Sequence, residues 1–307
     1  SDAEEISICR NSSEALETII FGLPLQKGDE VLVTNYDYPN MRNAWLQRQM
    51  REGIKLNWID IPIGLDDNEK IVKLYIDAIT SKTKVLHLTH VINWTGHILP
   101  AKRICEEAHK KGVEVVLDAA HSLAHKEMNL HDIDCDYAGI RLHKWLCAPF
   151  GTGMLYVKQN KIEKLWPLFS PEKPKEKNIR KFEALGTRSF PAEMAIGRAL
   201  SFHNSIGTNR KQKRLSFLKN YWVEKVKLHP KIKFYSPLSN HASCAIATVG
   251  IEGKKASEIE SYLMDKYGIH CVAIEWEKVN GIRITPHVYT STNDLDKLVG
   301  GLLEFAG

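Results

Sequence analysis

Short apolar segments alternate with amphipathic ones through the first half of the chain. Five segments have the length and composition of buried β-strands, because each is short, β-branched or apolar, and bounded by turn residues. They cover residues 30–35, 85–89, 113–117, 136–140 and 153–157. This alternation of strand and helix patterns predicts a mostly parallel central sheet flanked by helices on both faces, which is an α/β fold.

Helix signals fill the segments between and after these strands. Residues 100–112 begin with Pro100, carry apolar residues at Ile104 and Ala108, and end in Gly112. Proline near the start and glycine at the end are typical helix boundaries, so a crossover helix is predicted there. Further helices are predicted over residues 15–21 and 191–203.

A polar, basic stretch over residues 207–213 marks a change of pattern. We therefore predict a large α/β domain over residues 1–208 and a small α+β domain over residues 209–307. The small domain is expected to contain helices over 257–266 and 294–305, a strand over 269–274 and a strand over 281–285. A chain of 307 residues is long enough for two cores. Because it opens on Ser1 and enters patterned sequence at once, we expect a native N-terminal segment to precede it.

Composition narrows the classes of partner. The net charge is +5, and the basic run at 173–181 is interrupted by Glu176, which favours a solvated surface over a nucleic-acid footprint. The apolar run at 19–25 contains Gly22 and Pro24 and is too short to cross a bilayer. Six cysteines without a CxxC pair indicate reduced thiols, neither a zinc site nor a disulfide framework. A cytoplasmic protein is expected.

The most informative residues follow the predicted strands, because open α/β sheets place functional groups at the carboxyl ends of their strands. Asp118 ends an apolar strand, where an ionised carboxylate is costly unless it meets a cation such as a protonated pyridine nitrogen. Lys144 follows the next strand, and a lysine in a partly dry pocket can act as a nucleophile. The alternative is an ordinary strand-end acid and a surface lysine.

Other candidates are weaker when taken singly. Residues 11–13 precede a predicted helix, where backbone N–H groups and the helix dipole favour a phosphate, although Ser12 or Ser13 could be a plain N-cap. Tyr38 could stack on an aromatic ring or pack in the core. His121 and His125 stand four apart but lack the glutamate of an HExxH motif, so no metal site is predicted.

Taken in order, these segments resemble class V aminotransferases, the fold-type-I pyridoxal-phosphate family that includes isopenicillin N epimerase-like proteins, cysteine desulfurases and kynureninase. The resemblance covers nearly the full chain and implies the PLP-transferase fold type I and a pyridoxal 5'-phosphate cofactor. The residues that carry it are 10–15 (RNSSEA), 28–30 (GDE), Tyr38, 89–93 (THVIN), 118–121 (DAAH), 143–145 (HKW), 149–153 (PFGTG), 186–188 (GTR), Arg283 and Tyr289.

Three residues have catalytic roles by this resemblance. Lys144 would hold the cofactor as a Schiff base and then remove the α-proton of an amino-acid substrate. Asp118 would pair with the pyridine nitrogen of the cofactor. His121 would hydrogen-bond the ring oxygen, together with Asn93 from the cofactor-binding set.

The resemblance also implies how the rest of the cofactor is bound. Ser12, Ser13 and His143 would bind the phosphate, and Tyr38 would stack on the ring. Thr187 would reach the phosphate of a neighbouring subunit, since active sites in this family lie at the interface of a homodimer.

Two arginines complete the set. Arg283 would hold the substrate carboxylate, because a planar guanidinium can donate two parallel hydrogen bonds to it. Arg141 stands two residues before His143, where many relatives have serine or asparagine. We expect it to contact the cofactor phosphate or an acidic group of the substrate.

The position of Cys271 bears on which reaction the enzyme catalyses. Cysteine desulfurases carry a nucleophilic cysteine on a mobile loop, whereas Cys271 falls within the predicted strand 269–274 and is expected in the core. The predicted activity is therefore a class V aminotransferase of the isopenicillin N epimerase-like branch. The alternatives are a cysteine desulfurase or other lyase, and a binding protein that keeps the fold without the chemistry.

Overall fold

The computed structural model describes residues 2–188 and 190–307, and the chain divides into two compact units. The first unit comprises Ser1–Ile61, Asp67–Val91 and Leu99–Ile206. The second comprises Pro62–Asp66, Ile92–Ile98 and Gly207–Gly307. A single boundary at residue 208, as the sequence predicts, leaves the two short segments outside the second unit.

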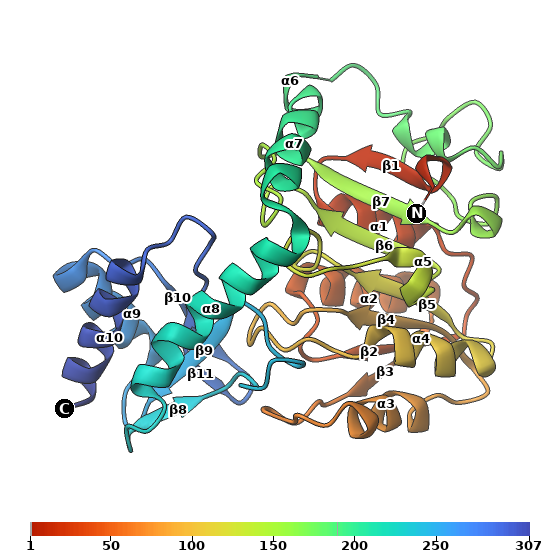
Figure 1. Ribbon diagram of the computed structural model, residues 1–307. Coiled ribbons are helices and arrows are strands. Elements are labelled where there is room, and N and C mark those ends of the chain that lie inside the picture. Colours follow the sequence, from red (N-terminus) through yellow and green to blue (C-terminus); the bar gives the residue numbers. More distant parts are fainter. Residues whose placement is uncertain (1, 189) are drawn as a thin grey trace. The chain divides into compact units, whose positions relative to one another are not determined.

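The first unit is built on a seven-stranded sheet (Figure 1) in the order β1-β7-β6-β5-β4-β2-β3. Strands β2 to β6 pair in parallel, and β7 pairs antiparallel with both β6 and β1. The predicted mostly parallel sheet is thus confirmed. The strands are β1 (Ile6–Cys9), β2 (Glu30–Thr34), β3 (Lys55–Ile59), β4 (Thr83–Thr89), β5 (Glu114–Asp118), β6 (Tyr137–Arg141) and β7 (Gly153–Val157).

Helices flank this sheet, with α1 and α2 on one face and α3 and α4 on the other (Figure 1). The apolar sides of α1 and α2 pack with alternate residues of the strands into a hydrophobic core centred on Leu16, Trp45 and Val116. The helices of this unit are α1 (Ser12–Gly22), α2 (Pro39–Glu52), α3 (Asn68–Asp77), α4 (Ala101–Lys110), α5 (Leu130–Ile133), α6 (Pro191–Met194) and α7 (Ile196–Ile206). Short 3-10 turns occupy Ala3–Glu5, Gln159–Lys161 and Ile179–Glu183.

The single helix predicted over 191–203 is wrong in one respect, because two helices occupy the segment. Ala195 takes ψ of −11° and its N–H bonds to the carbonyls of Pro191 and Glu193, which ends α6 in a tight turn. The next helix, α7, then extends to Ile206, three residues beyond the prediction.

The second unit is a small α+β domain, as predicted. Its four-stranded antiparallel sheet has the order β10-β11-β9-β8, and α8, α9 and α10 pack on it through an apolar cluster. The elements are α8 (Thr208–Val226), β8 (Ile232–Phe234), β9 (Ala247–Ile251), α9 (Ala256–Tyr267), β10 (Val272–Trp276), β11 (Val279–Ile284) and α10 (Thr292–Ala306).

The strand predicted over 269–274 begins three residues later than expected. Gly268 ends α9 in the left-handed conformation, and the N–H of Ile269 bonds back to the carbonyl of Leu263 at 3.1 Å, so Ile269 belongs to the helix terminus. Cys271 therefore precedes β10 rather than lying within it. Its predicted burial is confirmed, since the residue is 4% exposed.

The segment Ile92–Ile98 is held in the second unit by hydrogen bonds to its backbone. Thr248 Oγ1 donates to the carbonyl of Trp94 at 2.6 Å, and Ser236 Oγ donates to that of Thr95. The Trp94 ring also stacks on Trp276 with centroids 6.0 Å apart. These contacts explain why a segment that follows β4 in sequence clusters with the C-terminal residues.

A buried carboxylate joins two strand ends in the first unit. Asp37 is 1% exposed and accepts hydrogen bonds from Thr34 N–H and Thr89 Oγ1, both at 2.7 Å. Burial raises the pKa of Asp37 to about 6, although these hydrogen bonds oppose the shift. Asp37 thereby joins the carboxyl end of β2 to the carboxyl end of β4. Polar side chains were predicted to gather at the carboxyl ends of the strands.

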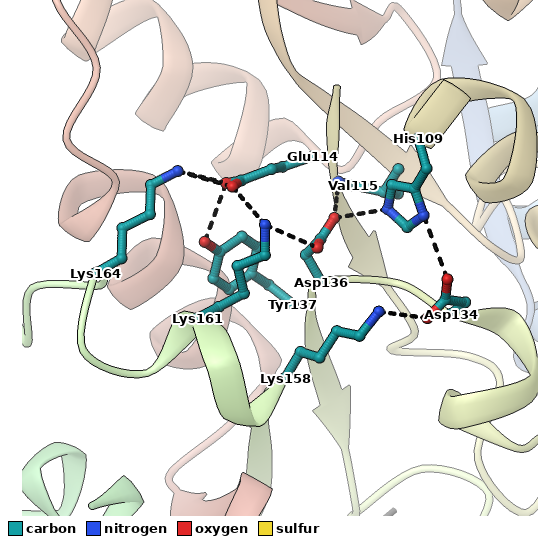
Figure 2. A network of polar contacts seen from close by, with 9 residues as sticks. All are labelled: His109, Glu114, Val115, Asp134, Asp136, Tyr137, Lys158, Lys161 and Lys164. Carbon is teal, nitrogen blue, oxygen red and sulfur yellow. Dashed lines mark hydrogen bonds and ion pairs between the residues drawn. The ribbon is translucent and has the colours of Figure 1, made fainter. Parts of the chain in front are cut away.

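The opposite edge of the same sheet carries a network of paired charges (Figure 2). At its centre Asp136 accepts from Val115 N–H at 2.8 Å and from His109 Nε2 at 2.9 Å, and it lies 3.3 Å from Lys161 Nζ. Lys161 also pairs with Glu114 at 2.6 Å. The amino ends of β5 and β6 are thus fixed by compensated charges.

Residues 2–188 and 190–307 contain neither a candidate membrane-spanning helix nor a candidate metal-binding cluster. No helix in that part of the chain is both long and apolar enough to cross a membrane. No three His, Cys, Asp or Glu side chains of the same residues gather where they could hold a metal ion.

We predict that Asp136→Asn lowers the free energy of unfolding by about 1.5–3 kcal/mol, the usual worth of hydrogen bonds to a charged group. Although burial opposes it, hydrogen bonds from His109 and Val115 lower the pKa of Asp136. This stabilisation is present above the pKa of the unfolded chain and is lost as pH falls through the folded value. Urea unfolding from pH about 7 down to about 3 should show the two proteins converging.

The matched control is Asp134→Asn, which removes a more exposed carboxylate paired with Lys158 at 2.5 Å. It should cost less than about 1 kcal/mol, because exposed ion pairs contribute little. Equal losses in the two variants would contradict the structural role given to Asp136.

We predict opposite outcomes for two substitutions of Asp37. Asp37→Ala leaves Thr34 N–H and the Thr89 hydroxyl unpaired and should cost about 1–3 kcal/mol. Asp37→Asn can accept from Thr34 and donate to Thr89, so it should retain the wild-type stability at pH about 5.

The pH dependence distinguishes Asp37→Asn from the wild type. A carboxylic acid with a raised pKa stabilises the fold most when it is protonated, and this contribution is lost as pH rises from the unfolded value through about 6. The asparagine variant should therefore become more stable than the wild type by pH about 8 in urea titrations. Parallel stability profiles would show that Asp37 titrates normally.

Candidate active site

Lys144 and His121 meet beyond the carboxyl ends of two neighbouring strands. His121 follows β5 and Lys144 follows β6, and Lys144 Nζ lies within hydrogen-bonding distance of His121 Nε2. Lys144 is partly buried rather than extended into solvent. The structure therefore brings together two of the three predicted catalytic side chains.

The third, Asp118, is the last residue of β5 and is 5% exposed. Its Oδ1 accepts a hydrogen bond from Ala120 N–H at 3.0 Å. Burial raises the pKa of the Asp118 carboxyl, and the neighbouring His87 and Lys144 act in the opposite direction. A buried acid with a raised pKa is a natural partner for a cationic ring nitrogen, since such a partner would compensate its charge.

An aromatic cluster supports His121 from the side away from Lys144. Trp145 Nε1 donates to His121 Nδ1 at 3.3 Å. The Trp145 ring stacks on His125 with centroids 3.7 Å apart, and His125 Nδ1 donates to the carbonyl of His121 at 2.9 Å. His121 and His125 are thus joined through Trp145.

Helix α1 points its first turn toward the same end of the sheet. It begins at Ser12, three residues earlier than predicted, and Asn11 is its N-cap, with Oδ1 accepting from Glu14 N–H at 2.9 Å. The alternative that Ser12 or Ser13 caps this helix is wrong, because both lie inside its first turn. The backbone N–H groups of a helix's first turn, together with the helix dipole, favour an anion.

Two glycines allow this helix to approach the strands. A Cβ on Gly153 of β7 would lie 2.5 Å from Asn11 Cα, and one on Gly139 of β6 would lie 2.4 Å from Leu16 Cγ. Neither position could hold a larger residue without moving the helix. The first turn of α1 is therefore placed beside the end of β6.

The end of β6 adds a histidine and an arginine to this region. His143 Nδ1 donates to the carbonyl of Thr152 at 3.1 Å. Burial lowers the pKa of His143, and the charges of Arg141 and Lys144 add to the effect. Arg141 Nε is buried and has no hydrogen-bond partner among residues 2–188 and 190–307. Such a donor suits an anionic ligand.

Two further predicted residues of the first unit lie in different surroundings. Tyr38 is the N-cap residue of α2 and packs, partly buried, against the hydrophobic core, as its core-packing alternative predicts. Thr187 is exposed and follows the 3-10 turn Ile179–Glu183. Their roles toward a cofactor ring and a second subunit stay predictions.

The remaining predicted residues, Asn93 and Arg283, belong to the second unit. Arg283 lies on β11, and its Nη1 donates to the carbonyl of Asn93 at 3.1 Å. Asn93 is 8% exposed, and its side-chain Oδ1 is buried without a partner among the described residues.

His90 lies beside Asp118 and was given no role in the sequence-based prediction. His90 follows β4, is 7% exposed, and donates its backbone N–H to the carbonyl of Asp118 at 3.0 Å. Burial lowers the pKa of His90 to about 4, so its ring is neutral. A histidine directly after a buried strand, next to the strand that ends in Asp118, is the signal that could have identified it.

The chemical groups gathered here match the groups that pyridoxal phosphate presents. An amine, a buried carboxylate, an imidazole and the N-terminus of a helix would bind its aldehyde, ring nitrogen, ring oxygen and phosphate, respectively. The first three lie at the ends of β5 and β6, and α1 begins beside them.

Comparison with known proteins shows the family of this chain. The family profile described as "Aminotransferase class-V" matches residues 1–298. Isopenicillin N epimerase from Streptomyces clavuligerus is 26% identical over 323 residues, which cover 100% of this chain and 81% of that protein. A probable cysteine desulfurase from Synechocystis is 27% identical over 285 residues, which cover 86% of this chain and 65% of that protein.

Solved structures share the fold. The apo cysteine desulfurase from Thermococcus onnurineus NA1 superposes with a TM-score of 0.88 at 21% identity, covering 100% of this chain and 80% of that one. The profile match extends over almost the whole sequence, including every segment that carries the candidate site. The chain belongs to the class-V aminotransferase family and is a pyridoxal 5'-phosphate-dependent enzyme.

Proposed function

We propose that the protein is an aminotransferase that acts on an amino acid and binds its cofactor covalently through Lys144. The observation that carries this proposal is the contact between Lys144 Nζ and His121 Nε2, beyond the strand end occupied by buried Asp118. Amine and carboxylate come from neighbouring parallel strands, β6 and β5, so one sheet edge supplies both.

The cofactor supplies an electron-accepting ring, and the protein supplies orientation and charge. Asp118 would sit opposite the ring nitrogen and hold it in its protonated, cationic form. His121 would donate to the ring oxygen. Lys144 Nζ would take the proton from the substrate Cα as general base.

Anion binding would fall to the first turn of α1 and the end of β6. Ser12 and Ser13 would bind the phosphate together with His143, and Arg141 would contribute a further cation. Thr187 is exposed, which fits a contact with the phosphate site of a second subunit in a homodimer. His90, with its neutral ring beside Asp118, joins Tyr38 as a candidate to stack on the cofactor ring.

Arg283 would bind the substrate carboxylate. Its Nη1 is oriented by the carbonyl of Asn93, and a planar guanidinium is suited to pair with a carboxylate in a fork geometry. Asn93 itself would bind the ring oxygen through its side chain.

Desulfuration is the nearest alternative, and the environment of Cys271 argues against it. Cys271 is buried, and burial raises its pKa to about 12. A thiol in that state is a poor nucleophile. Cys147 is exposed and follows Lys144 by three residues, so it is the cysteine that a test of sulfur chemistry must also include.

We predict that the purified protein has a visible absorption band which borohydride abolishes and which Lys144→Ala lacks after incubation with pyridoxal phosphate. Saturating amino donors should convert the bound cofactor of the wild type to the pyridoxamine form. Transaminase activity of Lys144→Ala should fall by at least about 10³-fold, because general acid–base catalysis alone contributes 10²–10⁴-fold.

Each part of this proposal can fail separately. A band that never converts to the pyridoxamine form, together with exchange of the substrate α-hydrogen for solvent deuterium, would indicate an epimerase. A protein without any band, even with added cofactor, would be a binding protein that keeps the fold.

Sulfide release from cysteine tests the lyase alternative. The wild type should release none, and Cys271→Ala and Cys147→Ala should match it. Release that is lost in one of the two cysteine variants would replace the aminotransferase proposal with a desulfurase.

A further inference from the structure

Trp145 is a neighbour of the candidate catalytic residues to which neither the family resemblance nor the proposed reaction gives a role. It follows Lys144 directly, is 5% exposed, and directs its indole N–H at His121 Nδ1 over 3.3 Å. An indole nitrogen can donate a hydrogen bond but cannot accept one. Its partner, Nδ1, must therefore offer a lone pair.

This donor determines where the imidazole carries its proton. A neutral histidine has one N–H and one lone pair, so a lone pair at Nδ1 places the proton on Nε2. The Nε2 atom is the one that meets Lys144 Nζ. His121 would then donate to Lys144, which requires the lysine amine to be uncharged when it accepts.

The opposite arrangement is disfavoured by burial. If Lys144 were an ammonium that donates to His121 Nε2, the proton of the neutral imidazole would lie on Nδ1. Nδ1–H and the indole N–H of Trp145 would then be two donors facing each other. Trp145 cannot turn to water, because its ring is buried and stacked on His125 with centroids 3.7 Å apart. His125 is itself fixed by its bond to the carbonyl of His121 at 2.9 Å. Lys144 is partly exposed and can more readily change its partner or its charge.

We propose that Trp145 is a positioning residue that holds His121 in the Nε2–H tautomer, so that the imidazole edge facing Lys144 donates a hydrogen bond. The inference rests on the proposed function for its purpose, since a donor at Nε2 is what the ring oxygen of the cofactor would need. An uncharged Lys144 is likewise the form that can attack an aldehyde. The tautomer can be measured without cofactor, so its failure is distinct from failure of the proposed function.

The test is histidine ¹⁵N NMR of the apo-protein at pH about 8, above the ordinary histidine pKa of about 6.5. His121→Gln identifies the His121 signals by their loss. The wild type should show a protonated Nε2 and an unprotonated Nδ1. Trp145→Phe keeps the ring that stacks on His125 but removes the N–H, and a protonated Nδ1 should then appear.

Trp45→Phe is the matched control. Trp45 is also fully buried and packs edge to face against His87, with ring centroids 6.3 Å apart. Its indole N–H, however, has no hydrogen-bond partner among the described residues. Its replacement should leave the His121 tautomer unchanged. A wild-type spectrum with a protonated Nδ1 overturns the proposal by itself, even if Trp145→Phe fails to fold. An Nε2–H signal that persists in Trp145→Phe overturns the role of Trp145.

Discussion

The need to compensate one buried carboxylate organises the candidate site. Asp118 ends a central strand at 5% exposure, where an isolated negative charge would be unstable, and burial raises its pKa. Within the chain it accepts a hydrogen bond from the N–H of Ala120. In a family of pyridoxal-phosphate enzymes, the cationic ring nitrogen would complete this compensation. The acid at Asp118 would therefore be most favourably placed when the cofactor is bound.

Charged side chains are paired differently at the two ends of the strands in the large sheet. At the amino ends of β5 and β6, Asp136 and Glu114 are matched by lysines, a histidine and a backbone N–H within the chain (Figure 2). At the carboxyl ends, Arg141 Nε is buried without a partner among residues 2–188 and 190–307, and Asp118 is only partly compensated. Charges are paired within the chain at the amino ends of these strands, whereas buried polar groups at the carboxyl ends are left for a ligand in the function that we propose. This contrast separates structural from functional charges more clearly than residue type does.

The sequence predicted the strands well because parallel strands buried on both faces must be apolar and short. It also predicted the polar positions just beyond β5 and β6, since these follow directly from the strand ends. It did not predict β3, an edge strand whose residues include Lys55 and Asn57. The attachment of Ile92–Ile98 to the second unit could not be predicted either. Backbone carbonyls of this segment accept the hydrogen bonds that hold it, and backbone carbonyls carry no sequence signal. Contacts between distant side chains, such as Trp145 with His121, depend on a loop conformation that no local pattern specifies.

Borohydride reduction of the holoenzyme followed by peptide mass spectrometry tests the central claim most directly, because it locates the covalent bond to the cofactor. The reduced cofactor should be found on the peptide that contains Lys144, and Lys144→Ala should yield no modified peptide. Modification of another lysine, or a complete absence of modified peptide in cofactor-loaded wild type, would contradict the assignment of Lys144.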